Sequence, residues 1–147
     1  MSPAEGGGME IFMYLASFEI NKKYLFRELS IYAAKADDVF QDEEKMIIDA
    51  HCLEMRIDNN GYENDLKYEV VLEKIVETFT PYELRMAYIE ILSVLLADDH
   101  ISEMEQLFIE DISDRFRMNE QEMQNAEEAL LLLKRAYSMM SDFISRK

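Results

Sequence analysis

The sequence predicts an all-α, single-domain protein, a bundle of about seven helices that contains an internal duplication of a three-helix unit. Helix breakers are scarce, with two Pro and four Gly in 147 residues, and 49% of the residues are hydrophobic, which is enough for one core. Apolar residues recur at spacings of three and four along most of the chain. A short acidic motif also occurs twice, each time between two helical patterns.

The first half of the chain is predicted to hold four of the helices. Met1–Gly8, with three consecutive Gly, is expected to be a flexible leader or tag remnant, so the folded domain is placed at 9–147. Asn21 is a suitable cap for the second helix, and Asp58-Asn59-Asn60-Gly61 is a typical loop. Apolar spacing then predicts helices over residues 10–19, 22–35, 42–57 and 65–79.

Three capping signals define the helices of the second half. Thr80, Ser102 and Asn119 are each followed three residues later by a Glu, which is the capping-box pattern. Pro81 suits the first helical position after Thr80. These signals predict helices over residues 81–97, 103–116 and 120–144.

The last predicted helix carries two apolar stripes with alternating spacings of three and four. One stripe consists of Met123, Ala126, Leu130, Leu133, Tyr137, Met140 and Ile144, and the other of Ala129, Leu132, Ala136, Met139 and Phe143. The favoured interpretation is a helix that spans the core of the bundle. The alternative is that one stripe contacts a protein partner or a second copy of the chain, as a homo-oligomer through this helix. A basic cluster, Lys134, Arg135, Arg146 and Lys147, lies on the same segment.

The acidic motif reveals an internal repeat with an offset of 61, which is 97 minus 36. Six residues of the first copy are identical to their counterparts in the second. They are Ala36, Asp37, Asp38, Glu44, Ile48 and Arg56, which match Ala97, Asp98, Asp99, Glu105, Ile109 and Arg117. The match runs without gaps over 36–58 and predicts that each half holds a helix, an acidic turn, a helix, a short loop and a helix.

Charge and cysteine content narrow the classes of function. The formal net charge of −16 disfavours nucleic acid and anionic membranes as partners, and it favours cations or a basic protein. Cys52 is the single cysteine, so no intrachain disulfide can form, which agrees with a cytoplasmic protein. No apolar run approaches the roughly 20 residues of a membrane span.

The two acidic turns are the candidate metal sites. The candidate ligands are Asp37, Asp38 and Glu44 in the first copy, and Asp98, Asp99 and Glu105 in the second. Carboxylate oxygens are hard ligands that suit Ca²⁺, Mg²⁺ or Mn²⁺. The same residues could act only as helix caps that interact with the helix dipole, and this reading is favoured on chemistry alone. The EF-hand pattern of ligands with a central Gly is absent from both copies.

The sequence does not predict an enzyme. It lacks Glu-x-x-His, His-Glu-x-x-His, a phosphate-binding Gly loop and Gly-x-Ser-x-Gly. His51 and Cys52 are adjacent on a predicted helix, so their side chains diverge by about 100°. We expect Cys52 to be a small core residue and His51 to be partly exposed.

The segment from Ala97 to Glu105 resembles the TerB family, which is associated with tellurite resistance. The family's turn reads Ala-Asp-Gly, followed by a hydrophobic residue, a capping Ser and a Glu three residues after the Ser. The residues that fit this turn are Asp98, Ile101, Ser102 and Glu105. Leu107 and Ile109 fit the core positions that follow it. Asp37, Phe40 and Glu44 fit in the first copy. The chain departs from the family where Asp38 and Asp99 replace Gly.

The resemblance extends over about residues 10–145 and implies a TerB-like helical domain. It also implies a cytoplasmic, stress-associated and non-catalytic protein that binds divalent cations through acidic residues. The alternative is an acidic protein-interaction module, of the immunity or nucleic-acid-mimic type, with no metal role. An enzyme with an acid-lined metal site is a third class, and it would need a pocket beside the turns.

Overall fold

The computed structural model describes residues 15–37, 40, 42–59, 61–96 and 101–146. Within these residues the chain is all-helical and contains no strand. The six helices are α1 (Ile20–Ala34), α2 (Asp42–Met55), α3 (Tyr68–Thr78), α4 (Pro81–Leu95), α5 (Glu103–Arg115) and α6 (Glu120–Ile144). None of the described helices is long and apolar enough to cross a membrane.

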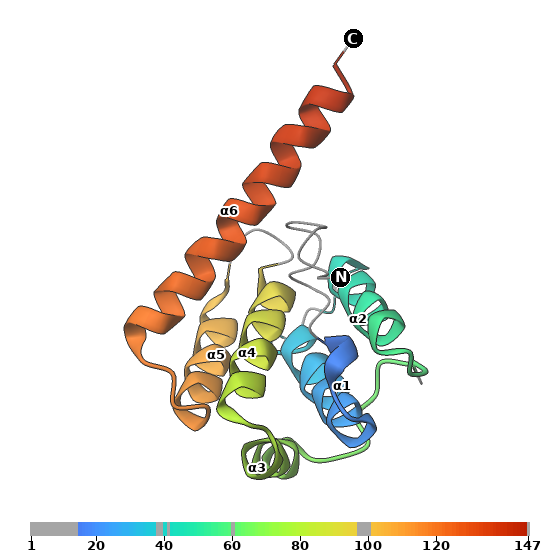
Figure 1. Ribbon diagram of the computed structural model, residues 1–147, viewed down its shortest axis with the longest axis vertical. Coiled ribbons are helices and arrows are strands. Elements are labelled where there is room, and N and C mark those ends of the chain that lie inside the picture. The colour runs from blue at the N-terminus through green and yellow to red at the C-terminus, as the bar shows by residue number, and fades with distance from the viewer. Residues whose placement is uncertain (1–14, 38–39, 41, 60, 97–100, 147) are drawn as a thin grey trace.

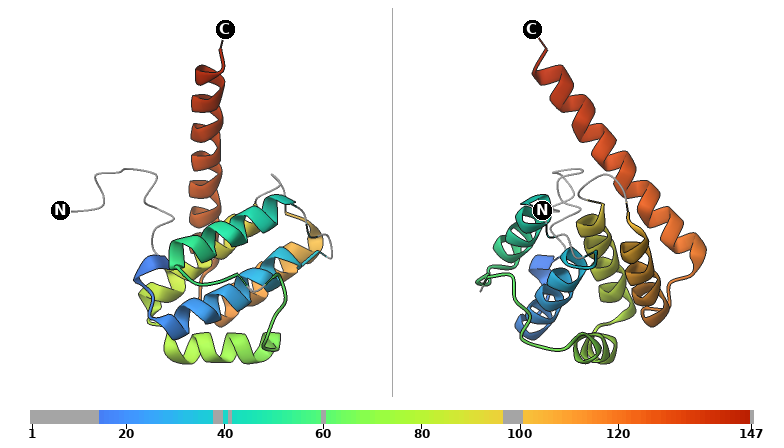
Figure 2. Two further views of the ribbon diagram at one scale, coloured as in Figure 1. Left: turned by 90° about the vertical axis from the view of Figure 1, so that its right-hand side faces the viewer. Right: turned by 180° about the vertical axis from the view of Figure 1, so that it is seen from behind.

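Helices α1 and α4 form the centre of the bundle. Helix α1 packs against α2, α3 and α4, whereas α4 packs against α1, α2, α5 and α6. Helix α6 crosses the α4–α5 side obliquely, and its C-terminal half projects beyond the other helices (Figures 1 and 2). The core between these helices is apolar, and its fully buried side chains include Phe26, Leu29, Ile48, Leu72, Ile75, Ile91 and Leu95.

The bounds of the helices repeat along the chain. Helix α1 spans 20–34 and α4 spans 81–95, so both ends are displaced by the offset of 61 found in the sequence. Helices α2 and α5 begin at 42 and 103, which differ by the same offset. Glu44 and Glu105, and likewise Ile48 and Ile109, are buried at matching positions.

Helices α2 and α5 also end in the same way. Arg56 and Arg117 follow them with φ values of 58° and 60°, in the left-handed region that non-Gly residues rarely adopt. The next N–H bonds back to a helix carbonyl at matching positions, from Ile57 to Cys52 (3.1 Å) and from Met118 to Ser113 (2.8 Å). Both ends are therefore Schellman-type caps built on an arginine.

The N-terminal elements differ from the sequence prediction. Residues 10–14 of the helix expected over 10–19 lie outside the described residues, and 15–17 form a single 3₁₀ turn, so six described α-helices stand where about seven were expected. Asn21 lies inside α1, because the helix begins at Ile20 after Glu19. The capping boxes expected at Thr80, Ser102 and Asn119 are all confirmed.

Helix α3 begins three residues later than predicted, at Tyr68 rather than Asp65. The reason is the buried carboxylate of Glu28 on α1, which accepts the backbone N–H groups of Asp65 (3.0 Å) and Leu66 (2.9 Å). Asn64 donates its side-chain amide to the same carboxylate at 3.2 Å. These bonds hold the loop before α3 against α1.

The prediction that α6 spans the core is wrong for its C-terminal half. Leu130 is the one buried residue among those described in α6. Other apolar residues that the spacing assigned to buried faces are exposed as well, including Met46 and Leu53 on α2 and Leu107 on α5. Hydrophobic spacing identified the helices, but it overestimated how much of each apolar face the bundle covers.

Candidate metal centre

Three of the predicted metal ligands meet in the structure. The carboxylates of Asp37, Glu44 and Glu105 each offer an oxygen, and these oxygens all lie within 4.8 Å of one another. Asp37 follows the end of α1, Glu44 lies in the first turn of α2, and Glu105 lies in the first turn of α5. The cluster therefore joins two carboxylates of the first copy of the acidic motif to Glu105 of the second copy, which matches Glu44 at the offset of 61.

Helix capping fixes one of these ligands in place. Glu105 is the third residue of α5, and its Oε1 accepts the backbone N–H of Ser102 at 2.9 Å. The hydroxyl of Ser102 in turn accepts the backbone N–H of Glu105 at 3.2 Å. The second oxygen of Glu105, Oε2, is buried. Capping and cation binding are thus compatible, because the cap uses one oxygen and orients the other.

The geometry fits one hard cation. Ca²⁺ and Mg²⁺ bind oxygen at about 2.0–2.6 Å, so two ligands of one ion lie at most about 4–5 Å apart, which matches the spacing in the cluster. Glu44 and Glu105 are only 2% and 1% exposed. Carboxylates so close together and so shielded from water repel one another, and a cation bound between them would lower this repulsion.

The other three predicted ligands, Asp38, Asp98 and Asp99, lie outside the described residues. The described ligands are too few to fill the six or more positions that Ca²⁺ prefers, so water or other groups of the chain would complete the shell.

A shallow hollow of about 440 Å³ adjoins the cluster, because its lining includes Ala36 and Met104, the chain neighbours of Asp37 and Glu105. Its polar groups are engaged in structural contacts. Lys35 donates to the Tyr62 carbonyl and pairs with Glu63 at 2.9 Å. The hydroxyl of Tyr68 donates to Asp111 at 2.6 Å, and burial raises the pKa of that hydroxyl.

A buried polar network between α1, α2 and α4 was not predicted. The Oγ of Ser30 lies 3.1 Å from Nδ1 of His51, and Nε2 of His51 lies 3.4 Å from Oε1 of Glu90. The expectation that His51 is partly exposed is wrong, since it is 4% exposed, whereas Cys52 is a buried core residue as expected. The sequence signal for the network was Glu90 within the apolar run 86–96.

The order of groups in this network, hydroxyl, imidazole and carboxylate, resembles that of hydrolase triads. Ser30 and Glu90 are both 0% exposed, however, so a substrate cannot reach the hydroxyl in this conformation. His51 and the neighbouring Glu54 line a mainly apolar cavity of about 500 Å³ between α2, α4 and α6. Burial, and then the charge of Glu90, raise the pKa of Glu54 to about 7.

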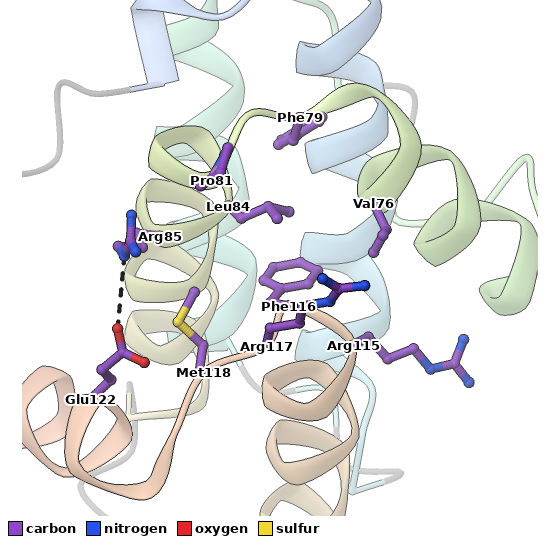
Figure 3. Close-up of a pocket in the computed structure, with 10 residues that line it drawn as sticks. All are labelled: Val76, Phe79, Pro81, Leu84, Arg85, Arg115, Phe116, Arg117, Met118 and Glu122. Carbon is purple, nitrogen blue, oxygen red and sulfur yellow. Dashed lines mark ion pairs between the residues drawn. The ribbon is translucent and has the colours of Figure 1, made fainter.

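A further hollow of about 350 Å³ lies where α3 and α5 end and α4 and α6 begin (Figure 3). Apolar side chains such as Leu84 and Phe116 point into it, and arginines surround it. Arg85 pairs with Glu122 at 3.8 Å, and Arg115 pairs with Glu69 at 2.8 Å. Arg117 also lines the hollow, so two of its three arginines are already paired with glutamates.

Comparisons with family models, with curated proteins and with solved structures found no match to this chain.

Proposed function

We propose that this chain is a non-catalytic, cytoplasmic, TerB-like protein that binds a divalent cation, Ca²⁺, Mg²⁺ or Mn²⁺, between its two acidic turns. The observation that carries the proposal is the meeting of Asp37, Glu44 and Glu105 within 4.8 Å, with both glutamates almost completely buried. A stress-associated role, as in tellurite resistance, is the biological setting that the resemblance suggests.

The proposal includes an internal duplication. The displacement of α1 and α2 by 61 residues onto α4 and α5 supports it, as do the arginine caps that end α2 and α5. In a duplicated fold the two acidic turns are equivalent elements. The meeting of Asp37 and Glu44 with Glu105 then creates one shared cation site with ligands from both halves.

A cation in this position would have a structural effect. It would link the end of α1 to the starts of α2 and α5, and so connect the first half of the domain to the second. Since only the folded chain brings the three carboxylates together, binding stabilises the folded state. At an ion concentration 100 times the dissociation constant, the gain is about 2.7 kcal/mol.

The test is a set of thermal unfolding curves and calorimetric titrations with Ca²⁺, Mg²⁺ and Mn²⁺, begun from protein treated with a chelator. We expect at least one ion to raise the unfolding temperature by several degrees, since about 1 kcal/mol corresponds to roughly 2–8 °C for domains of about 60–250 residues. Glu105→Gln retains the capping pattern, because Gln also serves at this position. It should therefore abolish the ion-dependent rise.

The matched control is Glu43→Gln, which alters an exposed carboxylate in the first turn of α2, next to Glu44. It should leave the ion-dependent rise unchanged. If no ion stabilises the protein at millimolar concentration, or if Glu105→Gln and Glu43→Gln behave alike, the carboxylates act only as caps and the metal proposal is wrong.

The second candidate function is an acidic protein-interaction module without a metal. Exposed carboxylates on α2, α3, α5 and α6 favour it, with Glu43, Glu73, Glu110 and Glu127 as examples. Binding of a basic partner through such residues would weaken steeply as salt concentration rises. A partner whose affinity is insensitive to salt, or depends on the divalent ion, would argue against this candidate.

A further inference from the structure

Helix α6 carries one apolar stripe that contacts the bundle and another that does not. On the first stripe, Leu130 is buried, and Leu133 and Tyr137 line the cavity shared with α2 and α4. The second, which we call the outer stripe, consists of Ala129, Leu132, Ala136, Met139 and Phe143. All five are exposed, and the three large side chains are 59%, 61% and 69% exposed in that order.

The outer stripe lies largely on the part of α6 that extends beyond the bundle (Figures 1 and 2). A free helix of about 12–15 residues is only marginally stable in water. The projecting part of α6 therefore becomes more stable if its apolar side packs against another surface. Alternating spacings of three and four over 129–143 form the seam by which one helix packs against another. The spacing therefore indicates a helical partner.

The outer stripe is complementary to itself when two copies run antiparallel. A two-fold axis between Tyr137 and Ser138 places Leu132 opposite Phe143 of the second copy, since 132 and 143 are equidistant from 137.5. The same axis places Ala136 opposite Met139, so that a small side chain meets a long one and the seam can fill. A parallel pair would instead set Ala136 against Ala136 and Phe143 against Phe143.

Charge favours the same arrangement. Residues 130–147 contain four basic residues and one acidic residue, a net charge of +3, which leaves −19 on residues 1–129. The antiparallel register brings Arg146 of one copy close to Glu128 of the other, because 146 corresponds to 129. A parallel register would bring the basic ends together, where like charges repel.

We propose that the projecting part of α6 is a dimerisation surface, on which the outer stripe packs antiparallel against the outer stripe of a second copy of this chain. A single pair of helices supplies fewer than the 20–30 residues per side of a standard interface, so the dimer should be weak. We expect a dissociation constant on the order of micromolar. This inference does not depend on cation binding.

Sedimentation equilibrium over a wide concentration range tests the association. The mass should rise from that of one 17.3 kDa chain towards twice that value. Leu132→Glu and Met139→Glu should each weaken association at least about tenfold without changing the unfolding temperature of the dilute monomer, because both side chains are exposed. Leu107→Glu, on α5 and 67% exposed, is the matched control and should leave association unchanged. A monomer at all concentrations, or equal effects of the three variants, overturns the proposal.

Cysteine crosslinking tests the orientation, because the native Cys52 is buried and the new thiols would be exposed. In the antiparallel register, a mixture of Leu132→Cys and Phe143→Cys proteins should form a disulfide-linked heterodimer. Neither variant alone should crosslink to itself. Self-crosslinking of the single variants, or the absence of a crosslink in the mixture, overturns the antiparallel arrangement.

Discussion

Replacing Glu54 by Gln is expected to stabilise this protein at neutral and alkaline pH. Glu54 lies on α2 beside the apolar cavity, where burial, and then the charge of Glu90, raise its pKa from 4.5 to about 7. The backbone N–H of Leu15 donates to Oε2 of Glu54 at 3.0 Å and opposes this rise without cancelling it. Gln retains an acceptor oxygen for such a bond but carries no charge.

The direction of the effect follows from proton binding. Between pH 4.5 and about 7 the unfolded chain has released the Glu54 proton, whereas the folded chain still holds it. The folded state therefore binds more protons, and the contribution of Glu54 to stability falls as pH rises through this range. Below pH 4.5 the Glu54 carboxyl is neutral in both the folded and the unfolded state, so it does not lower the free energy of unfolding. Above pH 7 the full cost of the buried charge is present.

The magnitude follows from the same two pKa values. A difference of 2.5 between pKa 4.5 and pKa 7 corresponds to about 3.4 kcal/mol. Glu54 is only partly buried, so solvent screening reduces this value, and we expect a gain of about 1–2 kcal/mol for Glu54→Gln above pH 7.

The assay is urea unfolding of the wild type and of Glu54→Gln at about pH 4.5 and about pH 8, where the difference in unfolding free energy should grow from near zero to its full value. Glu73→Gln, which alters an exposed carboxylate on α3, is the control and should show no such growth. Equal stability of wild type and Glu54→Gln at both pH values would refute the reasoning, as would a less stable variant at about pH 8.

The remaining predictions concern stability and are all measured by urea unfolding. Glu28→Ala should cost about 3–5 kcal/mol, because it leaves Arg27 buried without its ion-pair partner at 3.3 Å and frees the loop before α3; a loss below about 1 kcal/mol would contradict this role. Arg117→Gly should stabilise the chain by about 0.5–1 kcal/mol, because Gly adopts the φ of 60° without strain, and a clear loss would show that the arginine side chain matters more than the backbone. Ile91→Ala, at a fully buried position of α4, should cost about 2–5 kcal/mol.

Local chemistry made several elements predictable. Thr80, Ser102 and Asn119 start their helices as expected, because a capping box depends on residues only three positions apart. The loop at Asn59 and Gly61 likewise follows from residue type and spacing. The start of α3 was predicted wrongly because Glu28, 37 positions before Asp65, holds the intervening loop in a non-helical conformation.

The residues of the candidate site could likewise be predicted from the sequence, whereas their arrangement could not. The sequence identified Asp37, Glu44 and Glu105 as candidate ligands, since carboxylates in a repeated turn are visible without a structure. Their assembly into one cluster depends on how α1, α2 and α5 pack. Glu90, within the apolar run 86–96, was the sequence signal for a buried polar group. The burial of Ser30 and His51 beside it had no such signal, because a polar residue on a helix is buried only when its partners lie on other helices.

The sequence by itself determined that this protein is helical, where most of its helices begin and end, and that an acidic turn repeats after 61 residues. Helix formation and helix ends depend on contacts within about four residues, which are present in any short segment of the sequence. The repeat is visible directly in the order of the residues. Only the tertiary structure decided that Asp37, Glu44 and Glu105 share one cluster and that the outer stripe of α6 stays uncovered. Both depend on the packing of distant helices, and hydrophobic spacing shows which face is apolar but not which neighbour covers it.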